Sequence, residues 1–186
     1  MNAPVPAAHL CKRILVACIG NIFFGDDGFG VEVAKQLLGR QNQRYPENVH
    51  IIDFGIRGIE LAYTLLEDYD TLVLVDIVSR GGSPGTLYVL EPELPCDAAM
   101  QGMRSGSVAL DGHSMDPVKV LTLARTLGAP SMHTLLVGCE PATQGTGTVE
   151  EEMSMGLSEP VQAAIAAAIQ MIDEIIENFL SVSAAL

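Results

Sequence analysis

Apolar residues along the chain alternate between short continuous runs and stretches with a spacing of three or four. The continuous runs predict strands covered on both faces, and the spaced stretches predict amphipathic helices. The predicted strands are 13–19, 49–53, 71–77, 86–91 and 132–138. The predicted helices are 28–38, 58–67, 115–127 and a last one that starts at 158–160. Because strands alternate with helices, we expect an α/β fold with a mostly parallel, doubly wound sheet of about five strands between helices.

The predicted helices also indicate which side chains face the core. In 28–38 these are Phe29, Val33 and Leu37, and in 58–67 they are Ile59, Leu61, Ala62, Leu65 and Leu66. In the last helix they are Val161, Ile165, Ile169, Ile172, Ile176 and Phe179. The run 86–91 follows a turn rich in glycine at 81–85, so we expect an antiparallel edge strand there. Two long loops, 91–114 and 139–158, have no clear period, and long loops of this kind are often functional.

Length and composition place the chain among compact globular proteins. Its 186 residues, 48% of them hydrophobic, predict a single domain over 1–186 with a loose tail at 1–12. We expect no membrane insertion, because the longest apolar helical stretch, 161–172, is too short to span a bilayer. Four scattered cysteines without a C-x-x-C pair and the lack of a signal-peptide pattern favour the cytoplasm.

Net charge narrows the range of partners. The chain carries 10 basic and 23 acidic residues, which gives a formal charge of −13. This charge repels a polyanion, so we expect no nucleic acid partner. Cations and basic protein segments remain as candidates.

Two adjacent carboxylates, Asp26 and Asp27, follow the first predicted strand. Many α/β proteins bind a phosphate at this turn through backbone N–H groups and a helix N-terminus. Two carboxylates would repel a phosphate and attract a cation, so the turn indicates a cation site. As an alternative, either side chain could simply cap the following helix.

Three further side chains are expected at the same edge of the sheet. Asp53 closes the second predicted strand, Asp76 closes the third, and His113 precedes the third helix. Functional groups in such sheets gather beyond the carboxyl ends of the strands. Two carboxylates and an imidazole could bind a divalent ion, although this mixture does not select one metal. Asp53 could instead cap a turn with Gly55.

Several short motifs then resemble one family, the hydrogenase maturation proteases. These motifs are GNIFFGDDGFGV at 20–31, DFG at 53–55, LVDI at 74–77, PGT at 84–86, GH at 112–113, VGCEP at 137–141 and GLS at 156–158. The resemblance extends from about residue 14 to residue 179. In that family, an acid after the first strand, an aspartate after the third and a histidine contact the metal.

The resemblance implies a phosphorylase/hydrolase-like fold and an endopeptidase that removes the C-terminal tail of the [NiFe]-hydrogenase large-subunit precursor. Its metal and catalytic residues would be Asp27, Asp76 and His113, with Asp53 a further candidate for catalysis and peptide positioning. These residues would make it an aspartyl protease in the broad sense. It would store no cofactor, since the nickel belongs to the substrate, and zinc or cadmium could occupy the site in crystals. We expect a monomer.

Two other functions remain open from the residues alone. A receiver-like phosphoacceptor domain would use Asp76 with Mg²⁺, but it needs a lysine after the last strand, where this chain has Glu140. A flavin or nucleotide binder would share the architecture, but the acidic first turn argues against it. The second strand also departs from the family pattern Asp-Gly-Gly-Thr, because Phe54 follows Asp53.

Overall fold

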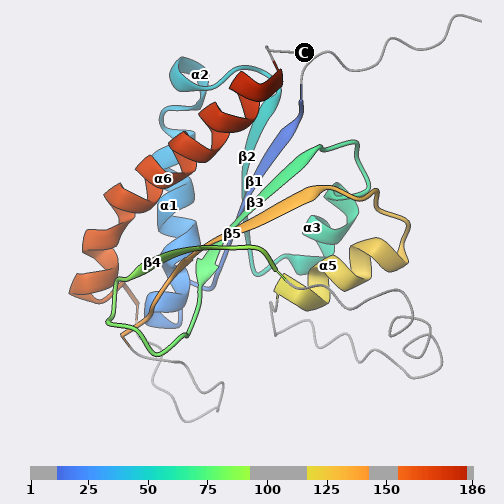
Figure 1. Cartoon of the computed structure of the whole chain (residues 1–186). Helices are drawn as coiled ribbons and strands as arrows, with labels where there is room; N and C mark the ends of the chain where they lie inside the picture. Colours follow the sequence, from blue (N-terminus) through green and yellow to red (C-terminus); the bar gives the residue numbers. More distant parts are fainter. Residues whose placement is uncertain (1–11, 93–116, 143–154, 184–186) are drawn as a thin grey trace, which may run out of the picture.

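The computed structural model describes residues 12–92, 117–142 and 155–183 (Figure 1). Its strands are β1 (Ile14–Ile19), β2 (Val49–Gly55), β3 (Thr71–Ile77), β4 (Leu87–Leu90) and β5 (His133–Cys139). Its helices are the 3₁₀ turn η1 (Gly25–Gly28), α1 (Phe29–Leu38), α2 (Gln41–Arg44), α3 (Gly58–Thr64), α5 (Pro117–Thr126) and α6 (Glu159–Ser183). Every predicted strand and helix is present. The short helix α2 was not predicted, because its four polar residues carry no apolar period.

All the strands belong to one sheet, in the order β2-β1-β3-β5-β4. The pairs β1–β2, β1–β3 and β3–β5 are parallel, and β4 pairs antiparallel with β5 at the edge. This arrangement confirms the predicted α/β fold and the antiparallel edge strand. Parallel strands direct their carboxyl ends to one edge of the sheet, which we call the carboxyl edge.

Helices cover both faces of the sheet and enclose two apolar layers. Figure 1 shows α1 and α6 on one face and α3 and α5 on the other. The first layer holds alternate residues of the strands, such as Val16, Cys18 and Val73, together with the inner sides of α1 and α6. The second layer holds the intervening residues, such as Ala17 and Leu74, with α3 and α5. Burial on both faces explains why the central strands are continuous apolar runs.

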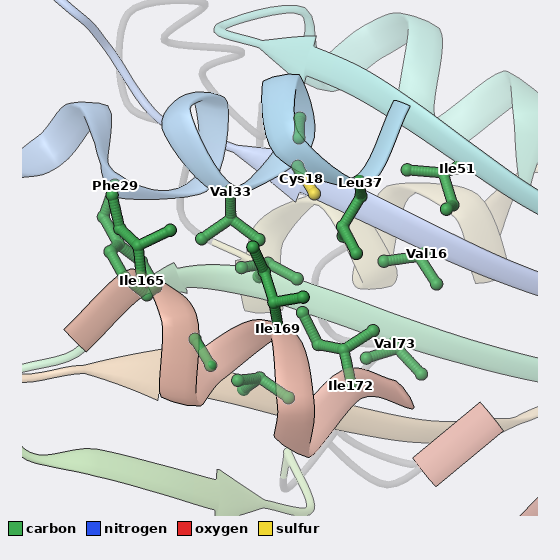
Figure 2. Packing of buried hydrophobic residues seen from close by; sticks show 14 of the residues in the cluster. Val16, Cys18, Phe29, Val33, Leu37, Ile51, Val73, Ile165, Ile169 and Ile172 are labelled. Carbon is green, nitrogen blue, oxygen red and sulfur yellow. The ribbon is translucent and has the colours of Figure 1, made fainter. Parts of the chain in front are cut away.

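The longest helix, α6, packs along α1 through the stripe that the sequence predicts. Figure 2 shows Ile165, Ile169 and Ile172 on the side of α6 that faces α1 and the sheet, and all three are buried. The predicted stripe of α1 is also fully buried. Burying one such side chain contributes about 1.5–3 kcal/mol, so this contact fixes where α1 and its preceding turn lie on the sheet.

The predicted inner face of α3 is partly wrong. Leu61, Ala62 and Leu65 are buried, but Ile59 is 52% exposed and Leu66 is 38% exposed. Ile59 lies two residues before Leu61, which places it on the opposite side of a helix with 3.6 residues per turn. Leu66 follows the last turn, because α3 ends at Thr64 instead of reaching residue 67.

Residues at the amino ends of the strands have structural roles. The ring of His50 hydrogen-bonds the Tyr69 hydroxyl at 2.7 Å and the carbonyl of Glu47 at 3.1 Å.

Cys18 and Cys139 are free, buried thiols, whereas Cys11 and Cys96 lie outside the described residues. Within the described ranges, no helix is long and apolar enough to cross a membrane.

A close backbone approach seats α1 on the sheet. A Cβ atom added at Gly30, in the first turn of α1, would lie 2.1 Å from the carbonyl oxygen of Ile19 and 2.6 Å from that of Val75. These two residues are at the carboxyl ends of β1 and β3. Glycine is therefore required here because of space, and the start of α1 rests directly on two strand ends.

We predict that Gly30→Ala destabilises the protein and Gly39→Ala does not. The methyl group at Gly30 would overlap backbone oxygens, which should cost about 2–3 kcal/mol. At Gly39, after the same helix, φ is −60° and an added Cβ would stay 3.6 Å from its nearest neighbours. Urea unfolding followed by circular dichroism measures both variants, and equal stabilities would contradict the proposed close packing.

Candidate functional site

Glycines and backbone hydrogen bonds define the turn between β1 and α1. Gly20 has φ +145° and Gly25 has φ +57°, conformations that side chains disfavour. The N–H of Asn21 donates to the carbonyl of Asp27 at 3.0 Å, and the N–H of Asp27 donates to that of Phe24 at 3.2 Å. The two acidic side chains are thus presented from a closed turn.

The carboxylate of Asp26 is buried, with 1% of the residue exposed. Its Oδ1 accepts the N–H of Ser158 at 2.7 Å, and its Oδ2 accepts the N–H of Ala142 at 2.8 Å and the Ser158 hydroxyl at 3.0 Å. Neither η1 nor α1 has a side-chain hydrogen bond at its N-cap. The alternative that one of the two aspartates caps this helix is therefore wrong.

Asp27 differs from its neighbour in having a half-buried side chain. Burial raises the pKa of its carboxyl group, and a backbone N–H bond from Asn21 opposes part of that shift. A raised pKa means that the charged form is poorly solvated in the folded protein. A cation beside Asp27 would relieve this cost, and a carboxylate in such surroundings is also suited to accept a proton.

Asp76 closes β3 and is buried, with 7% of the residue exposed. Its Oδ1 accepts the N–H of Ile77 at 2.8 Å. Along β3, Leu72 and Leu74 face α3 and α5, so the alternation of a strand places Asp76 on that same face. The side chain therefore lies at the carboxyl edge, on the side of α5.

The structure brings the segments that carry Asp27 and Asp76 together. Gly30 lies three residues after Asp27 and presses on the carbonyl of Val75, which immediately precedes Asp76. The turn η1 also contacts β3. The expectation that both acids lie at one edge of the sheet agrees with this arrangement.

Asp53 is at the same edge but on the other face. It pairs in register with Cys18, whose side chain lies in the layer under α1 and α6. Burial and the nearby Asp53 charge both raise the pKa of the Cys18 thiol. Asp53 Oδ1 accepts the N–H of Gly55 at 2.9 Å, the turn contact that the sequence offered as an alternative. Its catalytic role stays a prediction.

His113 lies outside the described residues, so its position relative to the two acids stays a prediction. The helix that follows it, α5, packs against α3 on the face that carries Asp76. Within the described part of the chain, no three histidine, cysteine, aspartate or glutamate side chains gather as a metal site. A site built from Asp27 and Asp76 would need a ligand from elsewhere.

Glu140, just after β5, is a buried acid for which the sequence predicted no contacts. Its carboxylate accepts the N–H groups of Arg80 and Gly81 and the hydroxyl of Tyr88, all between 2.9 and 3.1 Å. Burial raises its pKa, but these hydrogen bonds outweigh burial and the pKa falls below its usual value. The sequence signal that could have indicated this role is an acid directly after an apolar strand, in a chain that also has a glycine-rich turn at 81–85.

Besides Asp53, the described part of this edge contains Asp26, Asp27, Asp76 and Glu140. Asp26 and Glu140 are saturated by donors of the protein. Asp27, in η1, and Asp76, near the end of β3, contribute two further carboxylates to this edge. Such oxygens can bind a metal ion, orient water or accept its proton.

Comparisons with known proteins identify the family of this chain. The sequence profile of the hydrogenase maturation protease family matches residues 31–175. The hydrogenase expression/formation protein HupD of Bradyrhizobium diazoefficiens is 31% identical over 94% of this chain and 83% of its own length.

Two solved structures have the same fold. The hydrogenase 2 maturation peptidase of Thaumarchaeota archaeon SCGC_AB-539-E09 is 34% identical, with a TM-score of 0.60 over 89% of this chain and 98% of that one. The hydrogenase maturating endopeptidase HybD of E. coli is 27% identical, with a TM-score of 0.61 over 87% and 90%. With a family profile over most of its length and relatives of this similarity, the chain belongs to the hydrogenase maturation protease family, whose members hydrolyse peptide bonds.

Proposed function

We propose that this protein removes the C-terminal tail of a [NiFe]-hydrogenase large-subunit precursor after nickel has been inserted. In this proposal Asp27, Asp76 and His113 add ligands to the nickel ion that the precursor carries. The protein stores no metal of its own, and the nickel is part of the substrate. The observation that carries the proposal is the meeting of the Asp27 turn with the end of β3 at Asp76, in a chain of this family.

Recognition through the metal explains how an empty precursor is rejected. Without nickel, the two carboxylates would face the precursor with no cation between them, and the bonds to the ion would be lost. Asp27 already has a raised pKa because of burial, so bringing a protein surface over it without a cation would add to the cost. Hydrolysis also needs a base for the attacking water, and the carboxylates of Asp27 and Asp76 have that capacity.

Apolar side chains beside the acids suit a protein substrate. Ile22, Phe23 and Phe24 precede the two aspartates in the turn and are 36%, 48% and 41% exposed. The N–H of Phe23 donates to the Asn21 side chain at 3.1 Å, which holds the turn in this form. The family-like role of Asp53 in placing the peptide is part of this proposal, as are a monomeric state and a cytoplasmic location.

The receiver-like alternative is not favoured. A receiver would hold a phosphoryl group with a lysine after the last strand, whereas Glu140 stands here. Its carboxylate already accepts the N–H groups of Arg80 and Gly81. The sequence position at which a receiver needs a cation therefore holds an anion.

We predict that Asp27→Ala, Asp76→Ala and His113→Ala each lower the processing rate by about a hundredfold or more. Removing a group that only holds a metal ligand in place already lowers metal affinity or activity by about tenfold to a hundredfold, and removing the ligand itself should cost at least as much. The control is Glu67→Ala, an exposed acid paired with Arg13 at the amino ends of the strands. Mass spectrometry of a nickel-loaded precursor incubated with each variant measures trimming. Normal trimming by Asp76→Ala would contradict the proposed site.

Nickel in the precursor should be required for cleavage. We expect wild-type protein to trim the nickel-loaded precursor and to leave a nickel-free preparation of the same precursor intact. Adding nickel to the second preparation should restore trimming. Cleavage of both preparations at one rate would contradict recognition through the metal.

Replacing Asp27 by asparagine should stabilise the isolated, metal-free protein while removing activity. Because burial raises the folded-state pKa of Asp27, the wild type loses stability as pH rises from the unfolded pKa through the folded pKa. The Asp27→Asn variant lacks this loss. Its gain in free energy of unfolding over the wild type should therefore appear as pH rises through that range and disappear in acid. Urea unfolding between pH 4 and 8 measures the difference; an advantage that grows toward low pH would contradict the assignment.

A further inference from the structure

Two buried carboxylates at the carboxyl edge have no place in the proposed metal site. Asp26 and Glu140 are 1% and 4% exposed, and each accepts hydrogen bonds from segments far away in sequence. Both belong to or contact the short stretch after β5, residues 140–142. Asp26 adjoins Asp27, while Glu140 holds the turn that follows Asp76.

Asp26 fixes the turn that carries Asp27. Its two oxygens accept three hydrogen bonds, from the N–H of Ala142 and from the N–H and hydroxyl of Ser158. Ala142 follows β5 and Ser158 precedes α6, so one carboxylate joins three parts of the chain. Because η1 is only four residues long, a shift of Asp26 must also move Asp27.

Glu140 fixes the segment that leaves β3. Its carboxylate accepts the N–H groups of Arg80 and Gly81 and the hydroxyl of Tyr88 on β4. The backbone adds two bonds, from the Gly85 N–H to the Glu140 carbonyl and from the Glu140 N–H to the Thr86 carbonyl, both 2.8 Å. The chain after Asp76 is thus tied to the end of β5 at several points.

The connection between the two acids passes through β5 itself. The N–H of Val78 donates to the carbonyl of Cys139 at 2.9 Å, and Asp76 is in register with Gly138. A Cβ atom at Gly138 would lie 2.2 Å from a methyl carbon of Val78. Residues 138–142 therefore contact the segment after Asp76 at one end and Asp26 at the other.

We propose that Asp26 and Glu140 are positioning residues that set the separation of Asp27 and Asp76. This inference rests on the proposed function, since it takes those two acids as the groups that bind the precursor's nickel. A carboxylate can accept at both oxygens, whereas an amide must turn its NH₂ group toward one of the N–H donors. In a buried place that mismatch leaves donors unpaired, and the backbone must move to relieve it.

The test compares Asp26→Asn and Glu140→Gln with a matched control, Asp173→Asn. Asp173 lies on α6, away from the candidate site. Its side chain accepts a hydrogen bond from Tyr45 and is paired with Arg40, both near α2. Ser158→Ala is a milder variant, because it removes one bond to Asp26 and leaves the backbone bond. The readout is kcat/KM for trimming of nickel-loaded precursor, at a temperature where circular dichroism shows every variant folded.

We expect Asp26→Asn and Glu140→Gln to lower kcat/KM by about tenfold to a hundredfold, as displacements near 1 Å do. Ser158→Ala should fall between Asp26→Asn and wild type, and Asp173→Asn should stay within about twofold of wild type at a similar loss of thermal midpoint. Wild-type kinetics in Asp26→Asn and Glu140→Gln, or an equal defect in Asp173→Asn, would overturn the inference. If Asp26→Asn does not fold, Ser158→Ala decides: wild-type kinetics in that variant overturn the role of Asp26.

These outcomes are distinct from a failure of the proposed function. If wild-type protein leaves nickel-loaded precursor untrimmed, the proposed function itself is wrong. If wild type trims it, Asp27→Ala does not, and Asp26→Asn equals wild type, only the positioning role is wrong.

Discussion

The close approach of α1 to the ends of β1 and β3 is the constraint on which the site depends. Gly30 lies so near the carbonyls of Ile19 and Val75 that no side chain fits between them. This contact brings a turn that follows β1 next to the residue that closes β3. The packing of α6 along α1 holds the helix in that place (Figure 2). The core of the protein thus determines where the segments that carry Asp27 and Asp76 meet.

The carboxyl edge also shows how a chain of charge −13 can bury acids. Asp26 and Glu140 are surrounded by backbone N–H groups and hydroxyls that offset the lost solvation. Asp27 receives less of this support, and burial raises its pKa. The adjacent acids Asp26 and Asp27 therefore differ in their surroundings, because different donors face them. Asp26 and Glu140 join distant parts of the chain, whereas burial leaves the charge of Asp27 poorly solvated.

The sequence predicted the fold well because its signals are local and strong. Continuous apolar runs identified the strands, and the predicted stripe of α6 is buried from Val161 to Ile176, while Phe179 is partly buried. The same reasoning misjudged Ile59, because this residue lies on the opposite side of α3 from the buried Leu61. Packing against the sheet, and not helix propensity, decides which apolar side chains are buried.

The candidate site was only partly accessible to sequence reasoning. Position after a strand placed Asp76 at the carboxyl edge, and the family motif singled out Asp27. No local pattern could tell that Asp26 reaches Ala142 and Ser158, since those partners are 116 and 132 residues away. The role of Glu140 was missed for the same reason, because its partners belong to a different turn.

The central claim is that side chains distant in sequence, Asp27, Asp76 and His113, bind one metal ion. Crystals of the protein grown with cadmium, measured by anomalous diffraction, test it most directly. The account predicts one strong anomalous peak within bonding distance of all three side chains, and its loss in Asp76→Ala. Cadmium bound elsewhere, with these three side chains apart from one another, would contradict it.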